Sequence, residues 1–104
     1  MPVSIYRVVQ VLKGLRGELP MDVWSFVHKF EDVTGCKLSL AAEGKLVREV
    51  IVSEDVRVYV YAEQLCNVVC NDQSLPILPA LINVMYIHNT KNSIKYVAGY
   101  EVVV

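Results

Sequence analysis

Apolar residues recur at helical spacing twice in the first third of the chain. In residues 3–16 they fall on one face of a helix, which Gly14 and Gly17 bring to an end. A second apolar stripe follows Pro20, a residue favoured in a first helical turn, and stops before Gly35. These patterns predict two amphipathic helices, one on each side of a short break.

The spacing changes in the middle of the chain. A third amphipathic helix is predicted after Gly44 from four apolar residues at helical spacing, Leu46, Val47, Val50 and Ile51. From Val56 onward apolar and polar residues alternate, which is typical of a half-buried strand. A short turn at residues 62–64 is expected to join this strand to another, so that residues 56–70 form a β-hairpin.

The last third of the chain is the most apolar. Residues 75–88 carry apolar side chains nearly all round, which predicts a helix that is either central to the core or buried against a partner. Residues 93–104 predict a final strand that pairs with the hairpin. Its valine-rich end favours pairing across a two-fold axis in a homodimer; alternatively, these residues complete the internal core.

The predicted order of elements defines a fold class. We expect an α+β protein with a winged-helix-like core of three helices and a β-hairpin over residues 5–70. A C-terminal helix and a final strand over residues 75–104 extend this core. The chain has 104 residues, which predicts a single domain over residues 1–104.

The run from residue 17 to residue 59 resembles a LOTUS domain, also called OST-HTH. The matching positions are Leu19, Pro20, Phe26, Phe30, Gly35, Leu38, Gly44, Leu46, Val50 and residues 56–59. The resemblance covers about residues 5–70 and implies a winged helix. It also implies the partners of that family, which are structured RNA, including G-rich RNA, and DEAD-box helicases. Lys45 departs from the family pattern, since an aromatic residue usually follows that glycine.

Composition changes this picture mainly by favouring a protein partner. The net charge is −1, from ten basic and eleven acidic residues, which argues against a domain that works chiefly through phosphate contacts. Hydrophobic residues make up 54% of the chain, above the usual range, so a buried interface is expected in addition to a core. No apolar run reaches the length of a membrane span, and the chain begins without the pattern of a secretory leader, so no membrane contact is expected.

The chain contains three cysteines. This odd number favours a reducing compartment, so the protein is expected in the cytoplasm, with the nucleus as the alternative. Cys66 and Cys70 have the spacing of half a zinc site but lack further ligands. We interpret them as small buried hydrophobic residues on a strand, and expect no metal and no cofactor.

Candidate catalytic groups are few. His28 and Asp32 lie one turn apart on the second predicted helix, but no nucleophile accompanies them. Glu54 and Asp55 are adjacent, so their side chains diverge, and solvation is the better interpretation than acid–base chemistry. The sequence therefore predicts a protein that is not an enzyme.

The only tryptophan is the strongest functional clue. Trp24 lies off the apolar stripe of its helix, in a strip with Met21 and His28. Tryptophan is enriched at interaction hot spots, so these three residues form a candidate partner-binding patch. The alternative is that Trp24 lies beneath the predicted C-terminal helix of the same chain.

A second candidate surface flanks the predicted third helix and the first strand. Basic residues and outward-facing tyrosines can grip phosphates and stack on bases, although acidic residues occupy the same region. The candidate RNA-binding residues are Lys37, Lys45, Arg48, Arg57, Tyr59 and Tyr61.

These observations predict a non-catalytic protein-interaction adaptor in RNA metabolism, with a DEAD-box helicase as the partner that the resemblance implies. Direct binding of structured RNA by a winged-helix domain is the first alternative. A viral or structural accessory protein that self-associates is the second.

Overall fold

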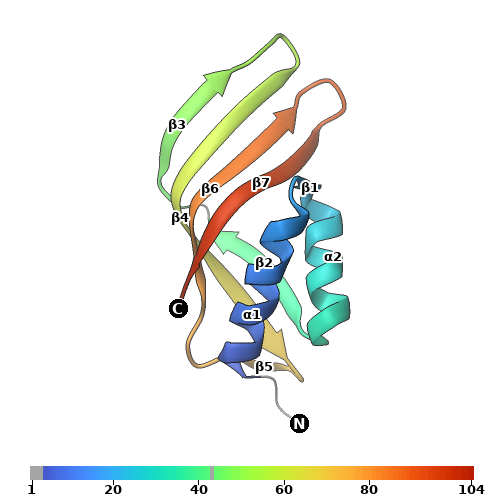
Figure 1. Cartoon of the computed structure of the whole chain (residues 1–104), viewed down its shortest axis with the longest axis vertical. Coiled ribbons are helices and arrows are strands. Elements are labelled where there is room, and N and C mark those ends of the chain that lie inside the picture. The colour runs from blue at the N-terminus through green and yellow to red at the C-terminus, as the bar shows by residue number, and fades with distance from the viewer. Residues whose placement is uncertain (1–3, 43) are drawn as a thin grey trace.

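The computed structural model describes residues 4–42 and 44–104, and this part of the chain is mostly strand, with two α-helices. Two helices lie on one face of a curled antiparallel sheet (Figure 1). The elements in chain order are α1 (Ile5–Leu15), the short 3-10 helix η1 (Arg16–Glu18), β1 (Met21–Asp22), α2 (Val23–Thr34), β2 (Lys37–Ala42), β3 (Leu46–Ile51), β4 (Val56–Cys70), β5 (Gln73–Ser74), β6 (Ala80–Asn89) and β7 (Ile94–Val103).

The sheet is organised around the long strand β4. Its strand order is β1-β7-β6-β4-β2, and β3 and β5 also pair with β4. Strand β2 pairs with the C-terminal half of β4, and β3 pairs with the N-terminal half, both in antiparallel orientation. The strands β2 and β3 therefore follow one another along the same side of β4.

The predicted winged-helix-like core of three helices is wrong. The helices expected over residues 3–16 and 20–35 are confirmed as α1 and α2, but the expected third helix is the strand β3. Nearly all side chains of β3 are exposed. The helical spacing of its apolar residues therefore does not correspond to a buried face. The β-branched residues Val47, Val50 and Ile51 fit a pleated strand better than a helix.

The predicted hairpin over residues 56–70 is also wrong, although its first strand is confirmed. Residues 62–64 continue β4 as one strand of 15 residues. What changes there is the buried face: Tyr61 lies opposite the buried Val84, whereas Gln64 lies opposite the buried Leu81. Since opposed residues share a face, the alternation of β4 shifts by one residue between these pairs. In the sequence, this shift interrupts the alternation of apolar and polar residues at residues 62–64, and such an interruption resembles a turn between two strands.

Gly44 lies close to this shift. A Cβ atom on Gly44 would lie 0.9 Å from the carbonyl oxygen of Glu63, so only glycine allows the chain to pass so close to β4. Gly44 therefore lies between β2 and β3 and does not precede the predicted third helix.

The helix predicted over residues 75–88 is wrong as well. This segment is a loop with Pro76 and Pro79, followed by β6. Strand β6 lies between β4 and β7, and Leu81, Val84 and Tyr86 are its buried residues. The final strand is confirmed as β7, but it pairs with β6 and β1 instead of pairing directly with β4.

Local signals fix both ends of α2. The side chain of Asp22 accepts a hydrogen bond from the backbone nitrogen of Ser25, and Gly35 ends the helix with a φ of 72°. The helix packs through Phe26 and Phe30, which are fully buried. The ring of Phe26 lies edge-on to Tyr100 of β7, with 5.7 Å between centroids.

The helix α1 is held against the sheet by a polar contact as well as by apolar packing. Its buried face includes Val8 and Leu12, both with no exposed area. The hydroxyl of Tyr100 donates a hydrogen bond of 2.6 Å to the carbonyl oxygen of Leu12. Burial raises the pKa of Tyr100, so this phenol remains a hydrogen-bond donor at neutral pH.

Among the described residues, no helix is long and apolar enough to cross a membrane.

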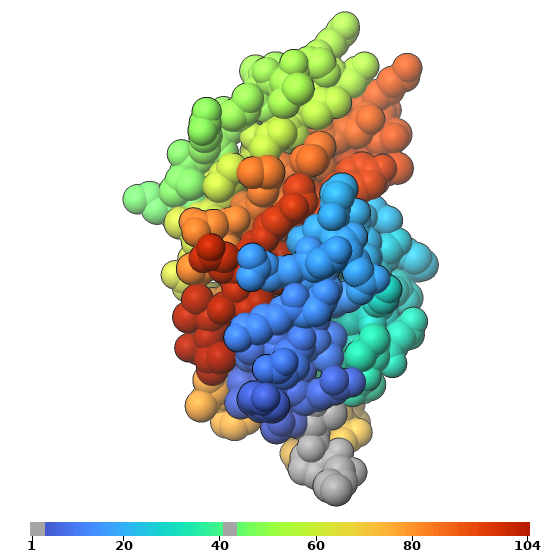
Figure 2. Space-filling view, viewed as in Figure 1, coloured from blue at the N-terminus to red at the C-terminus, as the bar shows by residue number. Residues whose placement is uncertain are grey.

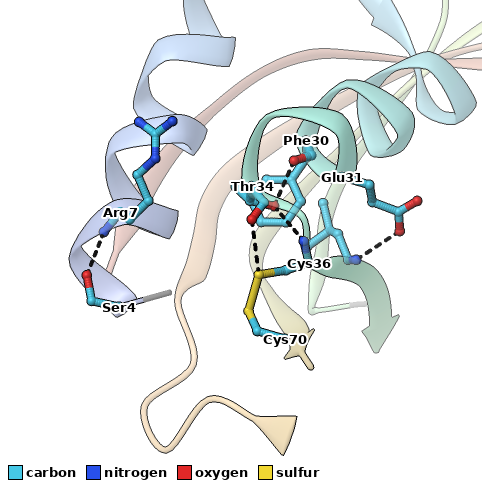
Figure 3. The surroundings of a disulfide bond; sticks show 8 residues. Ser4, Arg7, Phe30, Glu31, Thr34, Cys36 and Cys70 are labelled. Carbon is cyan, nitrogen blue, oxygen red and sulfur yellow. Dashed lines mark hydrogen bonds between the residues drawn. A yellow bond between two sulfur atoms is a disulfide. The ribbon is translucent and has the colours of Figure 1, made fainter. Parts of the chain in front are cut away.

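A disulfide joins the residue before β2 to the last residue of β4 (Figure 3). It links Cys36 to Cys70 across 34 residues of sequence. The hydroxyl of Thr34 accepts a hydrogen bond of 3.1 Å from the backbone nitrogen of Cys36, and the carboxylate of Glu31 accepts one of 3.1 Å from Leu38. These contacts fix the connection from α2 to β2. The expectation that Cys66 and Cys70 are buried on a strand is confirmed, but Cys70 is also bonded to Cys36.

The cytoplasmic compartment stays a prediction. A disulfide is instead typical of oxidising conditions, where such bonds persist.

We expect reduction of the purified protein, or the double substitution Cys36→Ala/Cys70→Ala, to lower the free energy of unfolding by about 3–4 kcal/mol, since the bond closes a long loop of the unfolded chain. Urea unfolding measures this loss. Thiol titration in denaturant should find one reactive thiol before reduction and three after it; three thiols at the outset would contradict the disulfide.

Candidate functional site

An open groove separates the N-terminal half of α2 from the start of β7. It has a volume of about 880 Å³. Its lining residues come from these two elements and from the junction between β1 and α2, and they are Asp22, Val23, Trp24, Ser25, Val27, His28 and residues 93–96. Trp24 is 70% exposed, and its ring lies 4.0 Å from the ring of His28, centroid to centroid.

The position of Trp24 follows from the abrupt start of α2. Strand β1 pairs with β7 through only two residues, Met21 opposite Val97 and Asp22 opposite Tyr96. The helix begins at the next residue, so its first turn is placed beside the start of β7. The side chain of Asp22 accepts hydrogen bonds from the backbone nitrogen and the hydroxyl of Ser25, at 2.9 and 2.7 Å.

These hydrogen bonds determine how the one acidic side chain of the groove lining contributes. They lower the pKa of Asp22, which holds its carboxylate in the charged form and occupied as the helix cap. The two other charge-bearing side chains of the lining, His28 and Lys95, are basic. The groove therefore offers an apolar floor, an exposed indole and basic groups.

The candidate patch of Met21, Trp24 and His28 is only partly assembled. Trp24 and His28 lie together in the groove. Met21 is half-buried and packs against the core from β1. The alternative, in which Trp24 lies beneath a C-terminal helix, is wrong because residues 75–88 form a loop and most of strand β6, and Trp24 remains largely exposed.

A second surface lies on the helix-side face of the sheet, where the β3–β4 and β6–β7 ends stand beyond the helices (Figures 1 and 2). We call it the tip face and define it by Arg57, Tyr59 and Tyr61 of β4, Tyr86 and His88 of β6, and Lys95 of β7. Arg57 lies opposite His88, and His88 lies opposite Lys95.

The aromatic rings of the tip face contact one another. Ring centroids are 6.4 Å apart for Tyr59 and His88, and 5.7 Å apart for Tyr61 and Tyr86. The ammonium of Lys95 lies 5.5 Å from the centroid of Tyr86. The hydroxyl of Tyr86 donates a hydrogen bond to the side-chain oxygen of the buried Gln64. The buried polar groups of Gln64 and Tyr86 thus form the floor of this face.

The structure brings together three of the six candidate RNA-binding residues, Arg57, Tyr59 and Tyr61. Arg48 points to the opposite face, because it lies opposite Val60 while its neighbour Glu49 lies opposite Tyr59. Lys37 begins β2 at the other end of the sheet, opposite Val69. Lys45 precedes β3, and its carbonyl oxygen accepts a hydrogen bond of 2.8 Å from Ala62.

Sequence reasoning missed Tyr86, His88 and Lys95. The first two fell within the segment assigned to a helix, where they would project in different directions. In a strand, residues two apart share a face, and this spacing of Tyr86 and His88 was the available signal.

The structure places the other reactive side chains apart from one another. Glu54 and Asp55 are exposed between β3 and β4. Burial raises the pKa of the free thiol of Cys66 to about 12, so it is not a thiolate at neutral pH. Within residues 4–42 and 44–104, no group of three metal-ligating side chains comes together.

The exposure of Trp24 predicts that it contributes little to stability. We expect Trp24→Ala to change the free energy of unfolding by less than about 0.5 kcal/mol, as for other exposed positions. The control on the same helix, Phe26→Ala, should cost about 3–5 kcal/mol, because it empties a fully buried site. Urea unfolding compares the two; a large loss for Trp24→Ala would assign the indole to the core.

Comparison of the chain with models of protein families, with curated proteins and with solved structures found no match. The winged helix that the LOTUS resemblance implied is absent from the fold, so the partners implied by that resemblance stay predictions.

Proposed function

We propose that this protein is a non-catalytic interaction module that binds a segment of a partner protein in the groove between α2 and β7. The observation that carries the proposal is Trp24, the only tryptophan, whose ring is 70% exposed in an open groove. Burying so large an aromatic surface against a partner provides binding energy that the isolated chain does not gain.

The lining defines the chemistry of the partner segment. Val23 and Val27 favour a bulky apolar side chain, which would pack against them and against the indole. His28 and Lys95 favour carboxylates beside that side chain. Asp22 does not oppose them strongly, since its oxygens accept hydrogen bonds from Ser25. The expected ligand is therefore an apolar segment flanked by Asp or Glu.

Selection from a random peptide library on the immobilised protein tests this proposal. We expect enriched peptides to share a bulky apolar residue with neighbouring carboxylates. Their binding should change the fluorescence of Trp24, which reports on the groove directly because the chain contains no other tryptophan. The substitution Trp24→Ala should weaken binding at least tenfold, as expected for a central aromatic anchor.

Tyr6→Ala is the matched control, because Tyr6 is 71% exposed on α1, outside the groove lining. This variant should bind the selected peptides as tightly as the parent protein does. Equal losses in the two variants, or binding with no change in Trp24 fluorescence, would refute the groove as the site.

A role in RNA metabolism with a DEAD-box helicase as partner rests on the LOTUS resemblance alone. A pull-down with and without nuclease tests it. Helicase retention that survives nuclease and fails with Trp24→Ala would support the adaptor role, whereas retention that nuclease abolishes would assign the contact to RNA.

Self-association is a second candidate, and the outer edge of β3 favours it. Val47 and Ile51 are 55% and 66% exposed, and in the described part of the chain β3 pairs only with β4. An apolar edge strand of this kind is a template for pairing with a second copy. If copies pair there, light scattering should detect a dimer at high micromolar concentration, and Val47→Lys should return it to a monomer. A monomeric parent protein would exclude this candidate.

A further inference from the structure

Three basic side chains form a row across the tip face. Arg57, His88 and Lys95 come from three adjacent strands, and each lies directly opposite the next. Neighbouring strands are about 4.8 Å apart, so the row spans about 10 Å from β4 to β7. Basic groups placed opposite one another destabilise a sheet unless an anion lies among them.

Among the described residues, none of these three basic groups forms an ion pair with a carboxylate. Within residues 4–42 and 44–104 the ion pair is Lys29 with Glu18, away from the sheet tip. On β3 the position opposite Arg57 is Ile51, and Glu49 lies opposite Tyr59 in the next row. The row therefore presents basic groups without ion-pair partners among the described residues, at an end of the sheet that the helices leave open (Figure 2).

Aromatic rings stand beside this charge. Tyr59 is half-buried in the next row of the same face, and its ring lies 6.4 Å from His88. Tyr61 follows one row further along β4. A basic row next to tyrosines is the combination that binds a nucleic-acid strand, because phosphates meet the cations while an unstacked base packs on a ring.

We propose that the tip face binds single-stranded nucleic acid, with phosphates along Arg57, His88 and Lys95 and a base against Tyr59. A single strand fits better than a duplex, since the tyrosines reach only bases that are free to leave their stack. A row of about 10 Å matches a short stretch of a nucleic-acid chain. This also agrees with a net charge of −1, which would oppose an extended electrostatic contact.

The tip face adds to the proposed protein-binding groove and does not depend on it. Lys95 belongs to both surfaces, so it cannot separate them. Arg57 belongs to the tip face alone and Trp24 to the groove alone. Their substitution therefore distinguishes failure of one proposal from failure of the other.

Fluorescence anisotropy with a short fluorescein-labelled oligouridine tests the tip face. We expect the logarithm of the binding constant to fall with the logarithm of salt concentration with a slope of about −1.4, from the permanent charges of Arg57 and Lys95. The variant Arg57→Glu should bind at least tenfold more weakly, with a slope of about half that value. Trp24→Ala should leave this binding unchanged.

Arg48→Glu is the matched control, because it makes the same change of charge on the neighbouring strand but on the opposite face. It should bind the oligonucleotide nearly as well as the parent protein does. Circular dichroism confirms that each variant is folded, and Arg57→Gln replaces Arg57→Glu if the latter is not.

Four results would overturn the proposal. The first three are equal losses for the Arg48 and Arg57 variants, no binding of the oligouridine at low salt, and equal binding of an RNA duplex. Displacement of the oligouridine by poly-glutamate at lower concentration than by unlabelled oligouridine would also overturn it, and would assign the basic row to an acidic protein segment.

Discussion

The pairing of β4 with β6 is the interaction on which the rest of the structure depends. It runs without a change of register from Val56 opposite Asn89 to Leu65 opposite Ala80. Every other strand except β1 pairs with one of these two, and β1 is added through β7. Because β4 has 15 residues, the sheet is longer than either helix, and α1 and α2 cannot cover all of it. The open end of the sheet follows from this difference in length.

The shift of alternation within β4 divides the sheet into two parts with different side-chain chemistry. On the covered part, Cys66, Val68 and Cys70 face the helices and close the core. On the open part, the same face carries Arg57 and Tyr59. One strand therefore contributes both to the core and to a polar, aromatic surface, and a displacement of one residue in the pairing would exchange the two faces. Gly44 and the disulfide lie along this strand and hold its neighbours in place.

The groove depends on a different constraint, the immediate passage from β1 into α2. Two residues of strand pairing are followed at once by a capped helix, so the side chains of the first two turns stand beside the edge of β7. The helix needs its core face for Phe26 and Phe30, which leaves Trp24 on the side. Because the indole is exposed, it is available to a partner and contributes little to the free energy of folding. The groove can therefore be tested by substitution of Trp24 without unfolding the protein.

The sequence by itself determined both helices, the stop of the second at Gly35, the alternating strand that begins at Val56, and the position of Trp24 off the core face. These are local properties, set by side chains within one or two turns or within a few residues of strand. It misassigned residues 46–51 because the apolar residues of the exposed strand β3 happen to fall at helical spacing. It misassigned residues 75–88 because a highly apolar segment has the same composition in a buried helix as in a strand that lies between two others. Only the tertiary structure decided that β4 continues through residues 62–64, that Cys36 meets Cys70, and that Arg57, His88 and Lys95 form one row. Each of these depends on which strands become neighbours. Hydrogen bonds between segments that are distant in the sequence fix the neighbours, and the spacing of residues along the chain carries no information about them.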